Sequence, residues 1–450
     1  MNCIFICVFT QQSYVDMFFL LLESIFIYGK LDTNTVLLVY TSTLFMNIIK
    51  QSHLFNDEKI KFEINDEYNN IDKACKARLD LFNLPSIFQY EKILYLDTDI
   101  LVKDDINKIF HICTKDILYV LEEGTITHEF WGGPLFGNEV KDYKDITAFT
   151  SGILLFNNCE AIRDLFSKIK EDIVKRPHFF ACYDQPYIVY NAFKYNLYNN
   201  KLLIPLVVNN DYNIHSDKII HHFPGGPGNY GHKMEKMMDF LVHFNDSTIV
   251  TALKKTVEYI NTNLLPIIIK SRESHEGNIF MLHNTTNYTN VFINKAKNIS
   301  KMVLNRNIKN VMEIGFNSGF STLLMLFSNP NIQISCFDLG EHSYTLPCFR
   351  KLQETFGDRI NITIGNSIST LPRVNNKKYD LIHIDGGHST EVATSDIVNS
   401  HRLSKKGTVL IMSDYDFPNL HKLWDEYVQK NGFKPLNMLY SSPHHDIKYV

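Results

Sequence analysis

Apolar and polar positions alternate along the chain in two separate series. In the first series, short apolar runs predict buried strands at Ile4–Phe9, Thr35–Tyr40, Lys92–Leu96, Ile117–Val120 and Gly152–Asn157. Amphipathic segments at Asp16–Tyr28 and Ala74–Phe82 lie between these runs and predict helices. Strands that alternate with helices are typical of a mostly parallel, doubly wound sheet.

The second series begins near Lys309. Its apolar runs predict strands at Val311–Ile314, Ile332–Phe337, Ile360–Ile364, Leu381–Ile384 and Thr408–Met412. Residues 246–300, between the two series, are polar and predict helix, whereas His221–Gly228 reads as a loop because it is rich in glycine and proline. A chain of 450 residues favours more than one core. We therefore predict an α/β protein with two Rossmann-like domains, the first at 1–245 and the second at 301–450, joined by a helical connection at 246–300.

Composition and charge narrow the classes of partner. The chain has 45 basic and 49 acidic residues, a balance that gives no electrostatic reason to expect nucleic acid or an anionic membrane as partner. Eight cysteines without a CxxC pair predict free thiols in a reducing compartment. The apolar start lacks a basic region and a cleavage site, and the run Met17–Tyr28 is too short to span a membrane. We expect a cytoplasmic protein. The heavy use of Asn, Ile, Lys, Phe and Tyr indicates an AT-rich genome, such as that of a large virus or a low-GC microbe, and a viral origin would place the protein in the host cytoplasm.

Two carboxylates, Asp97 and Asp99, directly follow the predicted strand that ends at Leu96. In an open parallel sheet, residues just past the carboxyl end of a strand line the ligand crevice. Carboxylates one residue apart can bind a hard divalent cation, which can bridge the phosphates of a nucleotide. The same Asp-x-Asp pattern also occurs in ordinary turns, so the spacing alone leaves both interpretations open.

The surroundings of this pair favour the metal site. The stretch Tyr90–Val102 closely resembles the metal-site motif of the retaining glycosyltransferases of family eight, the glycogenin and galactosyltransferase type. Further blocks occur in the order of that family, with Arg78 upstream of this stretch and with Thr150 and Ser151 replacing the usual Asn-Ala before Gly152. These blocks are Arg78, Ser151–Asn157, the pair Asp184 and Gln185, and the segment from His222 to Gly225.

The resemblance implies a GT-A type domain that binds Mn²⁺ and a UDP-sugar. Asp97, Asp99 and His222 would hold the metal against the diphosphate, with His221 as the competing ligand. Asp184 or Gln185 would face the anomeric carbon, and whether a side chain attacks covalently stays open.

The same resemblance assigns other residues to the donor. Arg78, Gly152 and Gly225 would lie at the nucleotide-sugar site, and the loop from Thr10 to Tyr14 would contact uracil and ribose. Lys233 would add a second positive charge, although the family places its lysine closer to the histidine.

A glycine-containing loop, Glu313–Ser321, connects a predicted strand to an apolar helix in the second series. Glycine permits the tight turn, and the amides at the start of the helix face the ligand. The loop resembles the E-x-G-x-x-x-G loop of class I methyltransferases more than the dinucleotide-binding GxGxxG. The resemblance implies that S-adenosylmethionine is bound through Glu313, Gly315, Asn317, Gly319 and Ser321.

Two later strand ends extend this second site. Asp338 lies where an acidic side chain can accept hydrogen bonds from ribose hydroxyls. Gly365-Asn366-Ser367 resembles the Gly-Asp-Ser that contacts adenine in the methyltransferases, so Asn366 and Ser367 are expected at the cofactor.

The segment from Asp385 to His388 resembles the Asp-x-x-His unit of metal-dependent sugar O-methyltransferases. This resemblance makes Asp385 and Asp414 ligands of a Mg²⁺ ion and His388 the general base, although Ser413 stands where that group has a glutamate. In the alternative interpretation, Asp385 only positions the methionine moiety and His388 is an ordinary turn residue.

Together the two resemblances predict a bifunctional transferase. It would move a sugar from a UDP-hexose to a glycan, protein or small-molecule acceptor and methylate a sugar hydroxyl. Two alternatives stay open: a methyltransferase with an unrelated substrate, or a module that binds sugar nucleotides without turnover.

Overall fold

The computed structural model describes residues 1–52, 54–177, 182–224, 231–289, 292–305, 307–375, 378–436 and 440–450. The chain folds into two compact units, Met1–His243 and Phe244–Val450. Each unit contains a seven-stranded sheet, and a three-stranded sheet adds to the first. The prediction of two α/β, Rossmann-like domains is confirmed.

The sheet of unit 1 has the strand order β3-β2-β1-β4-β7-β6-β8. Its strands are β1 (Asn2–Val8), β2 (Thr35–Thr41), β3 (Ile60–Ile64), β4 (Lys92–Leu96), β6 (Leu118–Thr125), β7 (Thr147–Asn157) and β8 (Tyr198–Asn199). β1, β2, β3 and β4 run parallel, whereas β7 is antiparallel to both β4 and β6. A second sheet joins β5 (Ile100–Val102), β10 (Ile220–His222) and β9 (Val207–Asn209).

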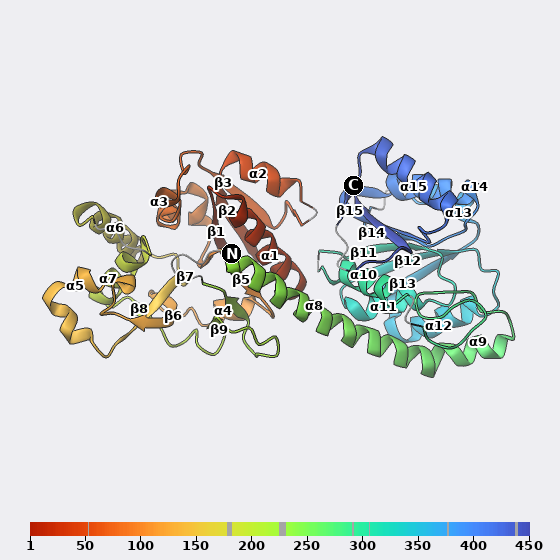
Figure 1. Ribbon diagram of the computed structural model, residues 1–450, viewed down its shortest axis with the longest axis horizontal. Helices are drawn as coiled ribbons and strands as arrows, with labels where there is room; N and C mark the ends of the chain where they lie inside the picture. The colour runs from red at the N-terminus through yellow and green to blue at the C-terminus, as the bar shows by residue number, and fades with distance from the viewer. Residues whose placement is uncertain are drawn as a thin grey trace. The chain divides into compact units, whose positions relative to one another are not determined.

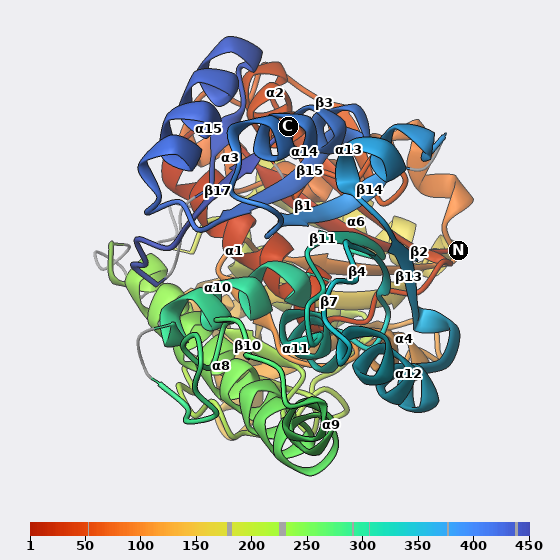
Figure 2. The same ribbon diagram turned by 90° about the vertical axis from the view of Figure 1, so that its right-hand side faces the viewer.

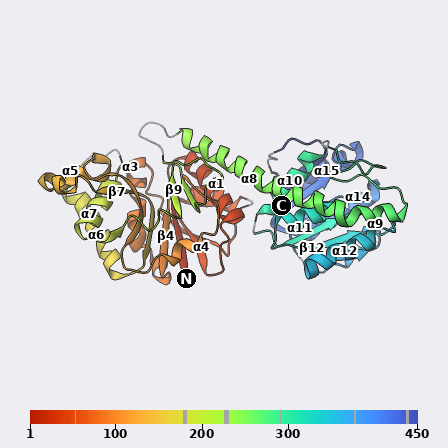
Figure 3. The same ribbon diagram turned by 90° about the horizontal axis from the view of Figure 1, so that it is seen from below.

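Helices cover both faces of the large sheet. Along β1, Ile4, Ile6 and Val8 pack toward one core, while Cys3 and Phe5 pack toward the other, as the period of two in a strand requires. In Figures 1 and 3, α6 and α7 lie on one side of the strands and α1 and α4 on the other. The helices are α1 (Gln12–Tyr28), α2 (Thr43–Lys50), α3 (Ile71–Ala74), α4 (Asn107–His111), α5 (Gly133–Phe136), α6 (Glu160–Lys175) and α7 (Gln185–Lys194).

The sheet of unit 2 has the order β13-β12-β11-β14-β15-β17-β16. Its strands are β11 (Asn310–Ile314), β12 (Gln333–Asp338), β13 (Ile360–Ile364), β14 (Tyr379–Ile384), β15 (Ser404–Ser413), β16 (Lys434–Pro435) and β17 (His445–Tyr449). The first five are parallel, and β17 inserts antiparallel beside β15. This insertion distinguishes the sheet from the dinucleotide-binding order 3-2-1-4-5-6.

Helices also flank this second sheet. Figures 1 and 2 show α13, α14 and α15 on one face and α10, α11 and α12 on the other. The helices are α10 (Ile293–Leu304), α11 (Phe320–Ser328), α12 (Thr345–Phe356), α13 (Ser367–Thr370), α14 (Thr390–Arg402) and α15 (Pro418–Asn431). The boundary between the units falls within α8 (Gly231–Tyr259), which a π-helical turn links to α9 (Leu265–Ser271).

Several sequence-based expectations need correction. The predicted helix Ala74–Phe82 is a short helix α3 followed by a 3-10 helix at Ala77–Asn83. His221 and His222, predicted in a loop, end strand β10, and the rest of that segment from Gly225 lies outside the described residues. Residues 272–289, predicted as helix, instead form turns and a bridge between Met281 and Tyr288. All eight cysteines are free, and the described helices include none long and apolar enough to cross a membrane.

A buried carboxyl group in α14 makes unit 2 sensitive to pH. Asp396 is 1% exposed, and neither carboxylate oxygen has a hydrogen-bond partner in the structure. Burial raises the pKa of Asp396 from its usual 3.8 to about 6. The folded state therefore releases this proton less readily than the unfolded state, so stability falls as pH rises from about 4 through 6.

We predict that Asp396→Asn removes this loss. A rise in the pKa from 3.8 to about 6 corresponds to about 3 kcal/mol of unfolding free energy at neutral pH. The melting temperature of the variant should exceed that of wild type at pH 7.5 and approach it at pH 4.5, measured by scanning calorimetry. The exposed Asp358→Asn is the control and should show no such pH-dependent difference. Equal differences at the two pH values would contradict the prediction.

Candidate functional site

Strand pairing brings Asp97, Asp99 and His222 together in unit 1. Asp97 follows β4, and Asp99 precedes β5. β10 pairs antiparallel with β5 so that His222 lies opposite Ile100, the residue after Asp99. The hydrogen bond from the Asp97 amide to the Gly152 carbonyl, 2.9 Å, ties the same turn to β7.

The three side chains have the spacing of metal ligands. One ligand atom from each side chain lies within 4.8 Å of the others. Among the described residues, no other group of three or more His, Cys, Asp or Glu side chains lies this close together. Asp99 Oδ1 lies 3.4 Å from His222 Nε2. This oxygen is buried and has no hydrogen-bond donor. A buried carboxylate oxygen without a partner is costly, and a cation would satisfy it.

Neighbouring residues orient His222. Its Nδ1 lies 2.8 Å from Asn209 Oδ1, the residue opposite it on β9. With the amide oxygen as acceptor, Nδ1 carries the hydrogen, and Nε2 faces the two carboxylates. His221, the competing ligand, points to the opposite face of the strand. There its Nδ1 lies 3.0 Å from the Asp211 carbonyl oxygen, and its ring packs on Phe240.

Gly152 leaves the space that this arrangement requires. A Cβ at this position would lie 2.7 Å from His222 Cε1, 2.8 Å from His222 Nε2 and 2.9 Å from Asp97 Oδ2. These distances are below ordinary van der Waals contact, so a side chain here would displace the histidine or the carboxylate. The glycine is therefore a steric requirement of the cluster.

Asp97 and Asp99 have different charged neighbours, and their pKa values shift in opposite directions. Lys233 Nζ lies 2.6 Å from Asp99 Oδ2. Burial alone would raise the pKa of Asp99, but Lys233 and His222 outweigh it and hold the pKa below its usual value. Burial raises the pKa of Asp97 despite the opposing effect of Arg78. Burial would lower the pKa of His222, but the Asp99 carboxylate outweighs it and raises that pKa.

Arg78 connects the cluster to Asp184. Its Nε and Nη2 donate to the two Asp184 oxygens at 2.8 and 2.6 Å, and Nη1 donates to the Ser151 carbonyl at 2.7 Å. The same Nη1 lies 3.5 Å from Asp97 Oδ1, which also accepts from the Tyr95 hydroxyl. Asp184 is fully buried, so in this structure its carboxylate is held by Arg78 and does not face open space.

Gln185 is more accessible than Asp184. It begins α7, and its Oε1 accepts from the Ser151 amide at 2.9 Å, while Nε2 donates to the Phe130 carbonyl at 3.1 Å. Thr10 follows β1 with φ of 67°, a left-handed conformation that costs energy outside glycine, and its buried Oγ1 has no partner. Tyr14 lies in the first turn of α1. Gly225 lies outside the described residues.

In unit 2 the glycine loop approaches the end of β14 closely. Gly315 has φ of +92°, and a Cβ there would lie 1.9 Å from the Asp385 carbonyl oxygen. Gly319 has φ of +80° and precedes α11, in whose first turn Ser321 is buried. Asp338 Oδ2 accepts from the amides of Phe316 and Asn317 at 2.8 Å each, so this carboxylate fixes the loop.

Glu313 differs from its predicted place at the cofactor. Its carboxylate is fully buried and accepts from the Thr322 hydroxyl and, at 3.0 Å, from His383 Nδ1. His383 Nε2 in turn lies 2.8 Å from Ser413 Oγ. This network joins β11, β14 and β15 inside the sheet, because strand residues at these positions face the core. In this structure Glu313 aligns strand ends and does not reach the loop surface.

The remaining predicted cofactor residues lie at strand ends. Asn366 caps α13 by accepting from the Ile368 amide at 2.9 Å, and Ser367 begins that helix. The Asn317 side chain donates to Glu276 Oε2 at 2.8 Å. Glu276 belongs to the segment 272–289, which carried no motif in the sequence and was expected to be helical.

Asp385 and Asp414 converge on a lysine that no sequence motif predicted. Lys295 Nζ, from α10, lies 3.6 Å from Asp385 Oδ1 and 3.6 Å from Asp414 Oδ1. His388 Nε2 lies 2.9 Å from Asp414 Oδ2, and this hydrogen bond raises the pKa of His388. The predicted Mg²⁺ site does not fit these residues, because an ammonium group already lies between the two carboxylates. A charged residue on the buried side of an amphipathic helix was the available signal for Lys295.

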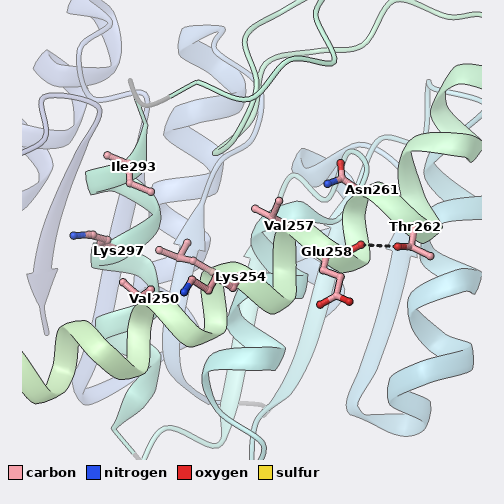
Figure 4. Close-up of a pocket in the computed structure, with 9 residues that line it drawn as sticks. Val250, Lys254, Val257, Glu258, Asn261, Thr262, Ile293 and Lys297 are labelled. Atoms are coloured by element: carbon pink, nitrogen blue, oxygen red, sulfur yellow. Dashed lines mark hydrogen bonds between the residues drawn. The ribbon is translucent and has the colours of Figure 1, made fainter. Parts of the chain in front are cut away.

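An apolar groove of about 670 Å³ lies between α8 and α10 (Figure 4). Val250, Leu253 and Val257 line it from α8, and Ile293 and Lys297 line it from α10. Its lining contains none of the predicted site residues. Lys297 and Lys295 therefore lie on opposite sides of α10, because Lys297 faces the groove and Lys295 faces Asp385 and Asp414.

We predict that Arg78→Met destabilises the protein by about 3–5 kcal/mol, since it leaves the Asp184 carboxylate buried and unpaired. Arg78→Met with Asp184→Asn should recover much of the loss, because the second change removes the orphaned charge. Urea unfolding followed by circular dichroism measures both. Lys76→Met breaks the exposed pair with Asp72 and should cost less than about 1 kcal/mol. A double variant no more stable than Arg78→Met would contradict this account.

Comparisons with known proteins match the two units separately. Residues 33–196 match the family described as glycosyl transferase family 8, and residues 312–415 match a methyltransferase domain. No curated protein matches the chain.

Solved structures of both kinds resemble the chain. Mouse xyloside xylosyltransferase 1 in its apo form is 14% identical, with 50% of this chain and 99% of that chain covered and a TM-score of 0.37. An active-site mutant of LgtC is 17% identical, with 53% and 95% covered and a TM-score of 0.37. The calicheamicin-biosynthesis TDP-rhamnose 3'-O-methyltransferase CalS11 is 14% identical, with 45% and 93% covered and a TM-score of 0.32. The chain thus combines a region that matches the family 8 glycosyltransferase model with a region that matches the methyltransferase-domain model, and the two matches support a transferase of both kinds.

Proposed function

We propose that unit 1 transfers a hexose from a UDP-sugar to an acceptor in a metal-dependent, retaining reaction. The observation that carries this proposal is the group Asp97, Asp99 and His222, in which Asp99 and His222 are buried and one Asp99 oxygen is unsatisfied. The match to glycosyl transferase family 8 over residues 33–196 supports it.

The donor set fits a divalent cation such as Mn²⁺. Two carboxylates and one imidazole nitrogen would hold it, and the bound ion would offset the charge that develops on the leaving diphosphate. Asn209 holds the imidazole in the tautomer that presents Nε2. Lys233 supplies a further positive charge beside Asp99 for the same phosphates.

Arg78, Asp184 and Gln185 form the wall beside this group. Arg78 fixes Asp184 through both oxygens and so positions the start of α7, where Gln185 lies. Gln185 is the more exposed of the two residues predicted to face the anomeric carbon, and we assign it to the sugar side. Asp184 acts through Arg78 as a positioning residue.

We also propose that unit 2 binds S-adenosylmethionine at the loop 315–319 and methylates a sugar hydroxyl. Bound S-adenosylmethionine would supply the methyl group: its methyl–sulfur bond would break, with the electron pair passing to sulfur, as the hydroxyl oxygen bonds to the methyl carbon, and His388 would take the hydroxyl proton. His388 suits this task because Asp414 binds Nε2, which leaves Nδ1 to accept the proton. The sugar added by unit 1 is the proposed substrate of unit 2.

The first test measures the release of UDP from a panel of UDP-hexoses in the presence of Mn²⁺. Wild type should hydrolyse or transfer from at least one donor, and Asp99→Ala should lower the rate at least about 100-fold, because a metal ligand is lost. Asp104→Ala, a change in an exposed ion pair of the same unit, is the matched control and should retain activity. Release of UDP by Asp99→Ala at the wild-type rate would contradict the proposed metal site.

The second test concerns unit 2 in the full chain. S-adenosylmethionine should raise its melting temperature, and mass spectrometry of the glycosylated product should show an added methyl group. His388→Ala should keep the thermal shift and lose methylation, because the base is removed while the cofactor site is intact. Methylation by His388→Ala at the wild-type rate would exclude the base role.

A further inference from the structure

We propose that the ammonium group of Lys295, in place of a divalent metal ion, is the resident cation of the acidic pair Asp385 and Asp414. This inference rests on the proposed methyltransferase function of unit 2 and concerns how that site balances its charge. It departs from the Mg²⁺ expected from the resemblance to metal-dependent sugar O-methyltransferases.

The position of Lys295 is the first support. Its Nζ lies 3.6 Å from one oxygen of each carboxylate, so it lies between the two side chains. The lysine side chain is 6% exposed and comes from α10, which packs against α11. Burying a charged lysine is costly unless it is paired, and the two carboxylates supply the pair.

The surrounding groups favour a charged Lys295. Burial alone would lower the pKa of Lys295, but Asp385 and Asp414 outweigh it and raise the pKa. His445 of β17 faces the same cluster, and burial together with Lys295 lowers the pKa of His445 to about 3. His445 is therefore neutral, and His445 Nε2 lies 2.8 Å from Asn298 Nδ2 on α10. The two ring nitrogens of His383, on the core side, already contact Glu313 and Ser413.

Both carboxylates that a magnesium ion would need already contact other side chains. Mg²⁺ requires oxygen ligands at about 2.0–2.1 Å in octahedral geometry. Asp385 Oδ1 and Asp414 Oδ1 face the ammonium group of Lys295, and Asp414 Oδ2 is bound to His388 Nε2. Ser413, which replaces the expected glutamate, points into the sheet toward His383. A metal ion here would also be repelled by the buried ammonium.

Unit 1 shows the opposite arrangement. There Lys233 bonds Asp99 Oδ2 and leaves Oδ1 without a donor, beside a histidine nitrogen that can bind metal. In unit 2 the lysine lies between the carboxylates, and the nearby His388 is bound through Nε2 to one of them. The two acidic clusters therefore differ in where the lysine sits, and we assign a metal to the first alone.

Lys295 acts in this proposal as a positioning residue. It balances the charge of the two neighbouring carboxylates, and Asp414 Oδ2 accepts the Nε2 hydrogen of His388. That hydrogen bond directs Nδ1 toward the hydroxyl whose proton it takes. No divalent cation is required for this arrangement.

The test counts Mn²⁺ ions bound to the full-length protein by electron paramagnetic resonance. Lys295→Met removes the charge at similar size and should bind one Mn²⁺ more than wild type, because Asp385 and Asp414 become free to bind it. Lys295→Arg keeps the charge and should bind the same number as wild type. Lys297→Met, on the groove side of α10, is the matched control and should also leave the number unchanged. Because the result is a difference, it does not depend on the metal content of unit 1.

Asp385→Asn in the wild-type background supplies a second measurement. The count should not change, because Asp385 holds no metal ion while Lys295 is present. This measurement decides the proposal if circular dichroism shows that Lys295→Met is unfolded. Loss of one Mn²⁺ in Asp385→Asn, or no gain in a folded Lys295→Met, would overturn it.

A separate measurement tests the function on which the inference rests. S-adenosylmethionine should raise the melting temperature of wild type in the presence of EDTA by the same amount as in its absence. No shift under either condition would reject the methyltransferase assignment, while the metal counts would still be readable. A shift that appears with Mg²⁺ and disappears with EDTA would overturn the role of Lys295.

Discussion

Burial of carboxylate groups is the constraint on which both candidate sites depend. Removing an ionised carboxylate from water is so costly that each one needs a positive or hydrogen-donating partner. Asp99 has Lys233, Asp184 has Arg78, Glu313 has His383, and the pair Asp385 and Asp414 has Lys295. These partners come from elements distant in sequence, so pairing the charges also fixes which strands and helices meet.

The consequence for chemistry depends on which oxygens remain free. Arg78 uses both oxygens of Asp184, which turns that carboxylate into part of the scaffold. Lys233 binds one oxygen of Asp99, and the other oxygen, which is buried beside His222, has no hydrogen-bond donor. A residue of the same type can therefore be a ligand at one position and a support at another, according to how many partners the fold supplies.

Periodicity predicted much of the fold. The strand that ends before Asp97, the strand that ends at Asp338 and the long helix α1 were recovered from apolar runs, because burial on both faces leaves an uninterrupted signal. The short strands β5, β9 and β10 were not predicted, since three residues carry too little pattern to separate from a loop. Yet these strands pair His222 with Asn209 and bring it to Asp99.

The sequence by itself determined the two α/β series and the acidic, histidine and glycine residues at their strand ends, because local patterns of apolar burial and turn formation are written in consecutive residues. Only the tertiary structure decided that His222 and not His221 faces the carboxylates, that Glu313 points into the sheet, and that Lys295 lies between Asp385 and Asp414. The physical reason is that charge pairing acts through space: Lys295 lies 90 residues before Asp385 and Arg78 lies 106 before Asp184. A pattern of neighbouring residues cannot indicate a pairing between residues so far apart in the sequence.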